Sequence, residues 1–483
     1  GLDVELPGDA MTSHLRPLLD DGRLSEAVLD RAVTRVLELK ARLGLVPEVR
    51  APQARRVSPA VEQDEADRRS REVVRLAVTL LANDGVLPLR QAGARVAVVG
   101  PAADELRVHF GSYTSVADTE IPQAIARIVS GQVSGLDPAP DVFPDLFQVM
   151  LPGIEPVFEA GARRLHPDAL TVLQAMRRID PDVTHHPLGS LDLDAPALDP
   201  IAINGAVATA DVVVAVVGER TGWVGNHTAG EGRTVARADL PGNQTELVEA
   251  LAASGKPVIT VVVSGRPLVL QRVHDASAAV VLAPLLGPSA GSAIADVVYG
   301  VVEPGGRTPS TFPRHVGQVP MYHGHPTGSG YDHPTLPRHG YVDLPDSTPL
   351  YPFGHGLTYT SFDLALDHAR VAQDVLHVEC GVQNDGARAG TTVVQLYAHH
   401  RGATVVRPVR QLVDFARVPL DGGAGTTTTF TVPIERLAYT WPDGRRGVEA
   451  GAVTLHLGLS SADIRASVAI DVPELVLPER PNR

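Results

Sequence analysis

The chain has 483 residues, of which 44% are hydrophobic and 20% charged, so it can form two to four domains with substantial cores. Its formal net charge of -14 argues against a nucleic acid or an anionic membrane as partner. The single cysteine, Cys380, excludes an intrachain disulfide and a thiolate metal cluster. This cysteine usage fits a cytoplasmic protein and leaves secretion open.

The N-terminal part predicts helices separated by a linker. Within 12–46, apolar residues recur at helical spacing after Ser25, a residue type that caps helices, and Gly44 ends the pattern. Residues 48–65 are rich in Pro and Arg, which is typical of a linker, and a second helix is expected at 63–82. The chain lacks an initiator Met and a signal segment, so we expect it to start partway through a longer polypeptide.

The middle of the chain alternates short valine-rich runs with helical patterns, which predicts an α/β domain with a parallel sheet over 75–310. Most of 105–205 is weakly patterned, and no role beyond an insertion follows from it. The expected strands, buried on both faces, are 96–99, 211–217, 257–263 and 278–282. The expected helices are 168–179, 243–254 and 290–299.

The C-terminal part has a different pattern. Residues 311–360 are dense in Pro, Gly and His and predict an irregular linker. Beyond it, over 361–483, short segments alternate apolar and polar residues and are separated by turn clusters. This pattern predicts an antiparallel β-sandwich, so the expected fold class is α/β plus all-β.

One glycine-rich loop, residues 218–241, follows the strand at 211–217 and carries two glutamates. Glu219 lies at its root and Glu231 near its far end. In open parallel sheets, ligands bind at loops that leave the carboxyl ends of strands. A carboxylate in this place could perform acid/base chemistry. The residues alone leave a solvated surface loop as the alternative.

Segments distributed over nearly the whole sequence match one family in their order and spacing, and together they are specific. They are 1–8, 35–45, 80–89, 96–104, 227–248, 255–268, 287–313, 351–362, 382–397 and 407–412. Through these segments the chain resembles the C-terminal part of a family 3 glycoside hydrolase of the bacterial β-glucosidase/β-xylosidase kind.

The resemblance implies a three-part enzyme of which the first part is largely missing. Residues 1–74 would be the end of a barrel domain and a helical linker, 75–310 the α/β sandwich domain, and 361–483 a fibronectin-III-like β-sandwich. The barrel supplies the nucleophilic aspartate, in a Ser-Asp-Trp type stretch that does not occur here. Asp3 matches the position just after the strand that carries the nucleophile in the family, and it is the alternative candidate for the nucleophile.

The resemblance also implies a mechanism and site residues. The family hydrolyses β-glycosides with retention, which requires two carboxyl groups about 5–5.5 Å apart. Glu231 matches the general acid/base, whereas Glu219, the competitor, is more easily explained as an anchor of the loop root. Trp223 and His227 are candidates for lining the sugar. The family commonly has an Asp-Arg pair after the glutamate; this chain has Thr234 and Val235 there.

The leading hypothesis is therefore a retaining exo-β-glycosidase that acts on β-linked oligosaccharides or aryl β-glycosides and needs a barrel domain or chain as partner. The alternative is a non-catalytic carbohydrate-binding or scaffold protein that has lost its barrel. No cofactor is implied, and a homodimer stays open. Histidines such as His323, His325 and His355 lack metal-ligand spacing with acidic partners, and no phosphate-binding glycine motif follows a strand.

Overall fold

The computed structural model describes residues 3–5, 11–46, 62–89, 93–132, 150–151, 153–231, 233–326 and 341–478. The linker predicted at 48–65 therefore lies largely outside the described residues, as does most of the segment 1–8. By its internal contacts the chain forms two units, Gly1–Arg69 and Ser70–Arg483.

The first unit contains helices that lie within 12–46, the region where the sequence predicts them. They are η1 (Thr12–His14), α1 (Leu15–Asp20) and α2 (Glu26–Arg42). The chain turns between them at Gly22, and Ser25 occupies the N-cap of α2 without a capping hydrogen bond from its side chain. Among the described residues of these helices none is buried, and the apolar side chains Val33 and Leu37 of α2 are exposed.

The second unit begins with a six-stranded sheet. Its strands, in spatial order, are β1 (Thr79–Asn83), β6 (Ala279–Ala283), β5 (Val258–Val263), β4 (Val212–Gly218), β2 (Val96–Val99) and β3 (Thr184–His186). Strands β6 to β3 pair in parallel, as the sequence predicts, and only β1 at the edge is antiparallel. The valine-rich runs of β4 and β5 are buried on both faces because helices cover the sheet on both sides.

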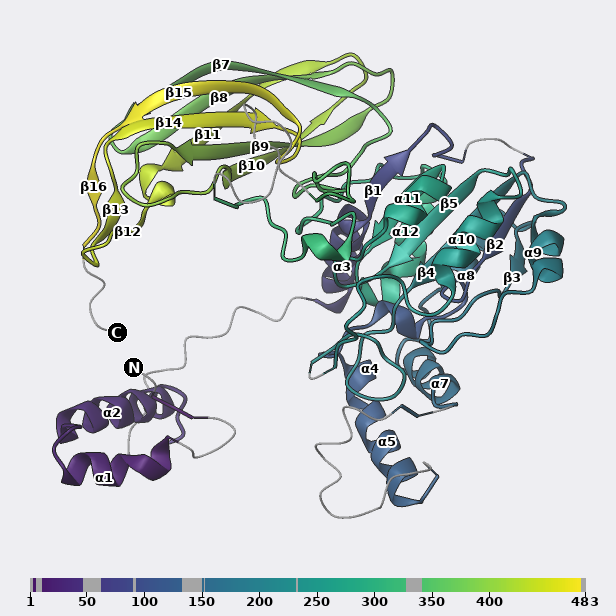
Figure 1. Ribbon diagram of the computed structural model, residues 1–483, viewed down its shortest axis with the longest axis horizontal. Helices are drawn as coiled ribbons and strands as arrows, with labels where there is room; N and C mark the ends of the chain where they lie inside the picture. Colours follow the sequence, from purple (N-terminus) through teal and green to yellow (C-terminus); the bar gives the residue numbers. More distant parts are fainter. Residues whose placement is uncertain are drawn as a thin grey trace. The chain divides into compact units, whose positions relative to one another are not determined.

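The covering helices form two layers, which gives this part three layers in all (Figure 1). On one face pack α3 (Gln63–Ala77), α8 (Val172–Ile179) and α12 (Ala290–Val298). On the other face pack α9 (Pro200–Val207), α10 (Gln244–Ala252) and α11 (Gln271–Ala276). The predicted helices at 168–179, 243–254 and 290–299 are confirmed in α8, α10 and α12, whereas α9 and α11 were not predicted.

The helix predicted at 63–82 is wrong in its last part. The helix α3 ends at Ala77, and the chain enters β1 at Thr79. The reason is tertiary, since Thr79 and Leu80 pair with β6 and both side chains are buried. Burial in the sheet overrides the helical propensity of the preceding residues.

The weakly patterned region 105–205 contains ordered structure that periodicity did not reveal. It folds into η2 (Arg107–His109), α4 (Ser115–Asp118), α5 (Glu120–Val129), α7 (Glu155–Leu165), α8, β3 and α9. The helices α4, α5 and α7 have their own small cores around Phe158 and Phe110. They lie beside the carboxyl end of the sheet and support the loop described below (Figure 1).

The third part is an antiparallel β-sandwich with one shared core. One sheet has the order β10 (Gln411–Leu420), β9 (Gly390–His400), β14 (Gly451–Gly458) and β15 (Ile464–Val472). The other has β11 (Gly425–Pro433), β8 (Val375–Asn384) and β7 (Phe362–Ala372), and a small sheet combines β12 (Tyr439–Thr440), β13 (Arg446–Val448) and β16 (Leu475–Val476). The predicted sandwich is confirmed.

The other short 3-10 helices of the described chain are η3 (Gly287–Ser289), η4 (Val316–Gln318) and η5 (Ile434–Leu437).

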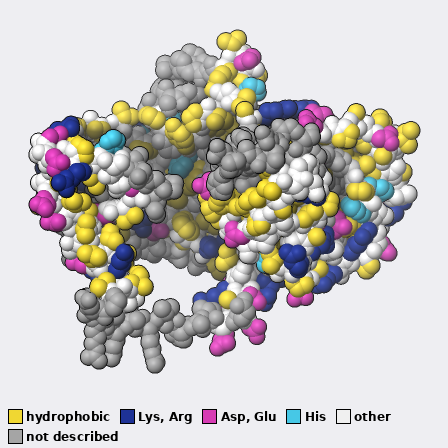
Figure 2. Space-filling view, turned by 90° about the horizontal axis from the view of Figure 1, so that it is seen from below, with side chains coloured by type: hydrophobic (Ala, Val, Ile, Leu, Met, Phe, Trp, Pro, Cys, Tyr) yellow, Lys and Arg dark blue, Asp and Glu magenta, His cyan; other side chains and the backbone are white. Residues whose placement is uncertain are grey.

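The surface mixes charges of both signs. On the face presented in Figure 2, Lys and Arg side chains are interspersed with Asp and Glu. One example is Arg272, which pairs with Glu246 at 3.2 Å and with Glu249 at 2.6 Å. None of the helices in the described part of the chain combines the length and the apolar composition that crossing a bilayer requires.

The helix layer over the sheet makes a direct prediction about stability. Leu251 of α10 is fully buried against the sheet, whereas Leu165 of α7 is 39% exposed. We expect Leu251→Ala to lower the free energy of unfolding by about 2–5 kcal/mol through lost burial and a residual cavity. Leu165→Ala, the matched control, should change it by about 0.5 kcal/mol or less. Urea unfolding followed by circular dichroism measures both, and equal losses would contradict the packing described here.

Candidate active site

The candidate site is built on the loop that leaves β4 at the carboxyl end of the sheet. β4 ends at Gly218, and Glu219 follows with its backbone N–H donating to the carbonyl of Val263 at the end of β5 (3.0 Å). The first loop residue is thus still held by the neighbouring strand. This places its side chain inside the protein, where Glu219 is completely buried.

The buried Glu219 carboxylate is fully engaged by side chains. It accepts hydrogen bonds from Ser264 Oγ (2.8 Å) and from Arg266 Nε and Nη2 (2.9 and 2.8 Å). Thr228 Oγ1, from farther along the same loop, donates to it at 3.3 Å. A buried charge requires this compensation. Glu219 therefore ties the loop to the end of β5, and its side chain is not available to a substrate in this arrangement.

A second buried ion pair, between Arg107 and Glu120, lies outside the loop and also supports it. The side chains of Arg107 and Glu120 are each 1% exposed and pair through the guanidinium and carboxylate groups. Arg107 also donates through Nη2 to the carbonyl of Thr221 in the loop (2.9 Å). Burial raises the pKa of Glu120, and the Arg107 charge opposes that rise. The region 105–130, for which the sequence suggested no role, thus fixes the position of the loop.

Trp223 and His227, the two predicted sugar-lining residues, have different environments. Trp223 is half-buried, donates through Nε1 to the carbonyl of Ser112, and meets the ring of Tyr113 edge-on at 5.4 Å between centroids. His227 is buried against Phe158, and burial lowers its pKa well below the usual value. Sugar binding by His227 would require the loop to open, and both assignments stay predictions.

Glu231 lies on the surface at the far end of the loop, where the local backbone depends on a glycine. Gly230 has a φ of +147°, and a Cβ there would lie 2.0 Å from the carbonyl oxygen of Gly222. Beyond Glu231, Arg233 is buried and donates through Nε to the carbonyl of His227 (2.6 Å). These contacts leave the Glu231 side chain exposed to solvent.

Tyr113 is the hydrogen-bond partner that the described part of the chain provides for Glu231. Its hydroxyl donates to Oε2 of Glu231, and the hydrogen bond to this carboxylate raises the pKa of Tyr113. Sequence reasoning missed Tyr113 because it lies in the weakly patterned region. Thr114, the next residue, caps α4 by accepting a hydrogen bond from the N–H of Ala117.

The other candidates are placed elsewhere. Asp3 pairs with Arg35 at 3.1 Å within the first unit. Within the described ranges, no three or more His, Cys, Asp or Glu side chains converge in a way that could hold a metal ion. His355 donates through Nε2 to the carbonyl of Leu81 (2.8 Å), which is a structural role.

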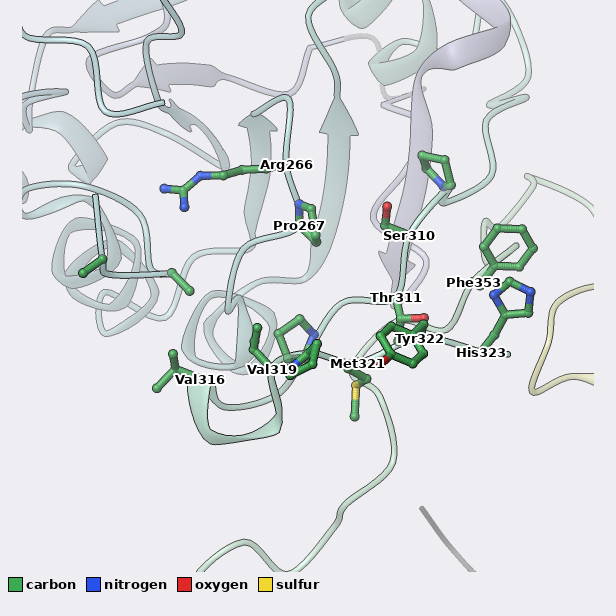
Figure 3. Close-up of a pocket in the computed structure, with 15 residues that line it drawn as sticks. Arg266, Pro267, Ser310, Thr311, Val316, Val319, Met321, Tyr322, His323 and Phe353 are labelled. Atoms are coloured by element: carbon green, nitrogen blue, oxygen red, sulfur yellow. The ribbon is translucent and has the colours of Figure 1, made fainter. Parts of the chain in front are cut away.

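A cavity of about 620 Å³ lies beside the last part of the loop and is mostly apolar (Figure 3). Val319, Met321 and Tyr322 form one side of it, and His323 stacks on Phe353. The side chain of Arg266 at its edge is directed away from these residues and pairs with Glu219. Glu231 does not line this cavity, which is therefore separate from the predicted acid/base position.

Comparisons with known proteins give matches over both large parts of the chain. Residues 78–359 match the family model described as "Glycosyl hydrolase family 3 C-terminal domain". Residues 392–461 match the model described as "Fibronectin type III-like domain". The first match covers more than half of the chain and contains the whole loop.

Similar proteins are glycosidases that are longer than this chain. The "Periplasmic beta-glucosidase" of Salmonella typhimurium is 31% identical over 96% of this chain and 58% of its own length. The "Beta-xylosidase" of Formosa agariphila is 31% identical over 98% of this chain and 59% of its own length. The crystal structure of a β-glucosidase from Listeria innocua in complex with isofagomine has a TM-score of 0.72 and 28% identity, over 99% of this chain and 60% of that one. The chain thus spans about three fifths of these relatives.

The anchoring of the loop by Glu219 can be tested by proteolysis. Arg233 is buried and Arg237 exposed, so trypsin should cleave the native loop after Arg237 in preference to Arg233. Glu219→Ala leaves Arg266 without its carboxylate and should open the loop. We expect cleavage after Arg233 to become at least about tenfold faster, because it follows the population of the open form. Fragment masses distinguish the two cleavage sites.

The control for this experiment is Glu246→Ala, which removes an exposed partner of Arg272. It should leave cleavage after Arg233 unchanged, because exposed ion pairs contribute little to stability. Equal cleavage of the wild type and Glu219→Ala would contradict the anchoring role.

The contact between Tyr113 and Glu231 predicts a pH-dependent signal. The hydrogen bond to Glu231 raises the pKa of Tyr113, since ionisation would place a phenolate against a carboxylate. Glu231→Gln removes that charge, so the pKa of Tyr113 should fall toward the ordinary value. Nuclear magnetic resonance of ring-labelled tyrosine measures this titration, with Tyr113→Phe to assign the signal. A Tyr113 pKa that is the same in Glu231→Gln and wild type would exclude the contact.

Proposed function

Because this chain belongs to glycosyl hydrolase family 3, we propose that it is the acid/base-bearing portion of a retaining β-glycosidase. The enzyme would release the non-reducing-end sugar from β-glucosides or β-xylosides. The observation that supports this most directly is the position of Glu231, an exposed carboxylate at the end of a loop whose root is held by the buried Glu219. A rigidly held loop with an accessible carboxylate is suited to completing a site in another part of a protein.

In the proposed reaction Glu231 acts twice. It first protonates the glycosidic oxygen as the sugar is transferred to a nucleophilic carboxylate, and it then takes a proton from the water that releases the sugar. The two carboxyl groups must be about 5–5.5 Å apart for this mechanism. The nucleophile would come from a barrel domain, either in the same polypeptide or on a separate chain.

The remaining residues of this chain would position Glu231. Arg107 and Glu219 hold the two sides of the loop root, and Tyr113 directs one oxygen of the Glu231 carboxylate through its hydrogen bond. Trp223, beside Tyr113, would present an aromatic face to the sugar or its leaving group. His227 is kept as a candidate that would contribute after the loop has moved.

Two observations support a barrel domain as partner. The relatives named above extend well beyond the region that this chain matches. In addition, the helix α2 exposes Val28, Val33 and Leu37, and none of its residues is buried. Packing against a larger domain would bury them. We therefore expect the 483-residue chain by itself to hydrolyse no glycoside.

The experiment uses a polypeptide that joins this chain to a family 3 barrel domain. The barrel is the one encoded upstream of Gly1 or, where none is encoded, that of the Salmonella relative. We expect Glu231→Ala to lower kcat/KM for cellobiose by about 10²–10⁴-fold, because proton transfer to a poor leaving group is lost. Dinitrophenyl β-glucoside needs less protonation and should lose much less. Azide should restore turnover by attacking the glycosyl-enzyme intermediate without a general base.

The matched control is Glu435→Ala, which removes an exposed carboxylate of η5 in the β-sandwich and should leave kcat/KM unchanged. Retained cellobiose hydrolysis by Glu231→Ala would show that the acid/base residue lies elsewhere. Activity of the isolated chain would show that it does not need a barrel.

A further inference from the structure

Two arginines line a cavity of about 350 Å³ that lies far along the chain from the acid/base loop. Arg307 belongs to the segment that follows α12, and Arg417 to the edge strand β10 of the sandwich. Both reach the same short stretch of backbone. Arg307 donates through Nη1 to the carbonyl of Gly306 (2.8 Å), and Arg417 through Nη1 to the carbonyl of Gly305 (3.2 Å).

Neither arginine has an acidic partner among the residues that the structure describes. This distinguishes them from Arg107, Arg220 and Arg266 near the loop, which pair with carboxylates. The Nε of Arg307 is buried and has no hydrogen-bond acceptor. Burial lowers the pKa of Arg307 to about 10, and the positive charge of Arg417 contributes to this shift. The two like charges are thus close enough to repel each other.

The other polar groups of the cavity are already engaged. Thr308 Oγ1 donates to the carbonyl of Pro352 (2.6 Å) and accepts from the N–H of His355 (2.9 Å). Gln395 donates to two backbone carbonyls and accepts from the hydroxyl of Tyr397 (2.5 Å). The free hydrogen-bonding capacity of the lining therefore resides in the guanidinium groups, which only donate.

The rest of the wall is apolar. Its side chains are Leu76, Pro309, Phe353, Val393, Leu412 and Phe415. Phe415, which lines the cavity, lies on the edge strand β10 and is 58% exposed. A large exposed apolar residue on an edge strand favours contact with a ligand or a partner.

From this arrangement we propose that the cavity binds a carboxylate group carried on an apolar or aromatic body. A carboxylate only accepts hydrogen bonds and matches the planar fork of a guanidinium, so it would satisfy the buried Nε of Arg307 and remove the repulsion between the two arginines. The apolar body would fill the space between Phe353 and Phe415. The carboxylate could belong to a free small acid or to an acidic side chain of a polypeptide segment. The site is independent of the proposed hydrolysis.

The test titrates the 483-residue chain with sodium benzoate and with benzamide, its uncharged counterpart of the same shape, at constant ionic strength. Isothermal calorimetry and the unfolding temperature report binding in the millimolar range. We expect benzoate to bind and benzamide not to bind. Arg417→Gln should weaken benzoate binding by about tenfold or more, because a charge-assisted contact is lost.

Arg417 is exposed, so its replacement should leave the fold intact, and the loss of repulsion should keep the unfolding temperature of the free chain unchanged or higher. Arg436→Gln is the matched control, since Arg436 is exposed in η5 of the same sandwich. It should bind benzoate as the wild type does. Arg307→Gln, checked for folding by circular dichroism, tests the second arginine.

A second arm distinguishes the source of the carboxylate. It uses the end-blocked tripeptides Phe-Glu-Leu and Phe-Gln-Leu. Binding of Phe-Glu-Leu in preference to Phe-Gln-Leu, without binding of benzoate, assigns the site to an acidic side chain of a polypeptide. Binding of benzoate alone assigns it to a small acid. The proposal is overturned if neither carboxylate probe binds more tightly than its neutral counterpart, or if Arg417→Gln binds as the wild type does.

Discussion

The arrangement of the candidate site depends on the burial of the Glu219 carboxylate at the end of β4. A completely buried charge is stable only when hydrogen bonds and an opposite charge compensate it, and here Ser264, Arg266 and Thr228 do so. Two of these partners lie just past the end of β5 and one lies within the loop itself. The same carboxylate therefore joins the neighbouring strand to the middle of the loop. Any large movement of the loop root would expose this carboxylate to solvent or leave it buried without its hydrogen-bond partners.

This anchor acts together with a support that comes from a distant part of the sequence. The guanidinium of Arg107 holds the carbonyl of Thr221, and Glu120 keeps that guanidinium in place. Val224 packs into the small core around Phe158. The loop is thus held at Glu219, at Thr221 and at Val224, while Glu231 stays exposed. Rigid support combined with an accessible terminal carboxylate is the physical property that a residue serving a second domain requires.

Much of the fold could be predicted from the sequence, because the strands that are buried in the sheet appear in the sequence as short runs of apolar residues. The valine runs of β4 and β5 are short and rich in β-branched residues, which predicts strands buried on both faces. The expectation that Glu219 anchors the loop root rested on its position next to β4. The helix predicted through residue 82 failed because pairing of Leu80 with β6 is a tertiary effect. Tyr113 was missed because it is an exposed residue between short elements, where hydrophobic periodicity carries no information.

The exposure of Glu231 also defines what a barrel domain would have to contribute to the proposed reaction. A general acid must keep a proton near neutral pH, which requires desolvation or a nearby like charge. The Glu231 side chain lies on an open surface, where it contacts solvent and the hydroxyl of Tyr113. A nucleophilic carboxylate about 5–5.5 Å away would supply the like charge, and the walls of a sugar pocket would exclude water. The chemistry proposed for Glu231 therefore belongs to the assembled site, whereas the geometry that presents Glu231 belongs to this chain.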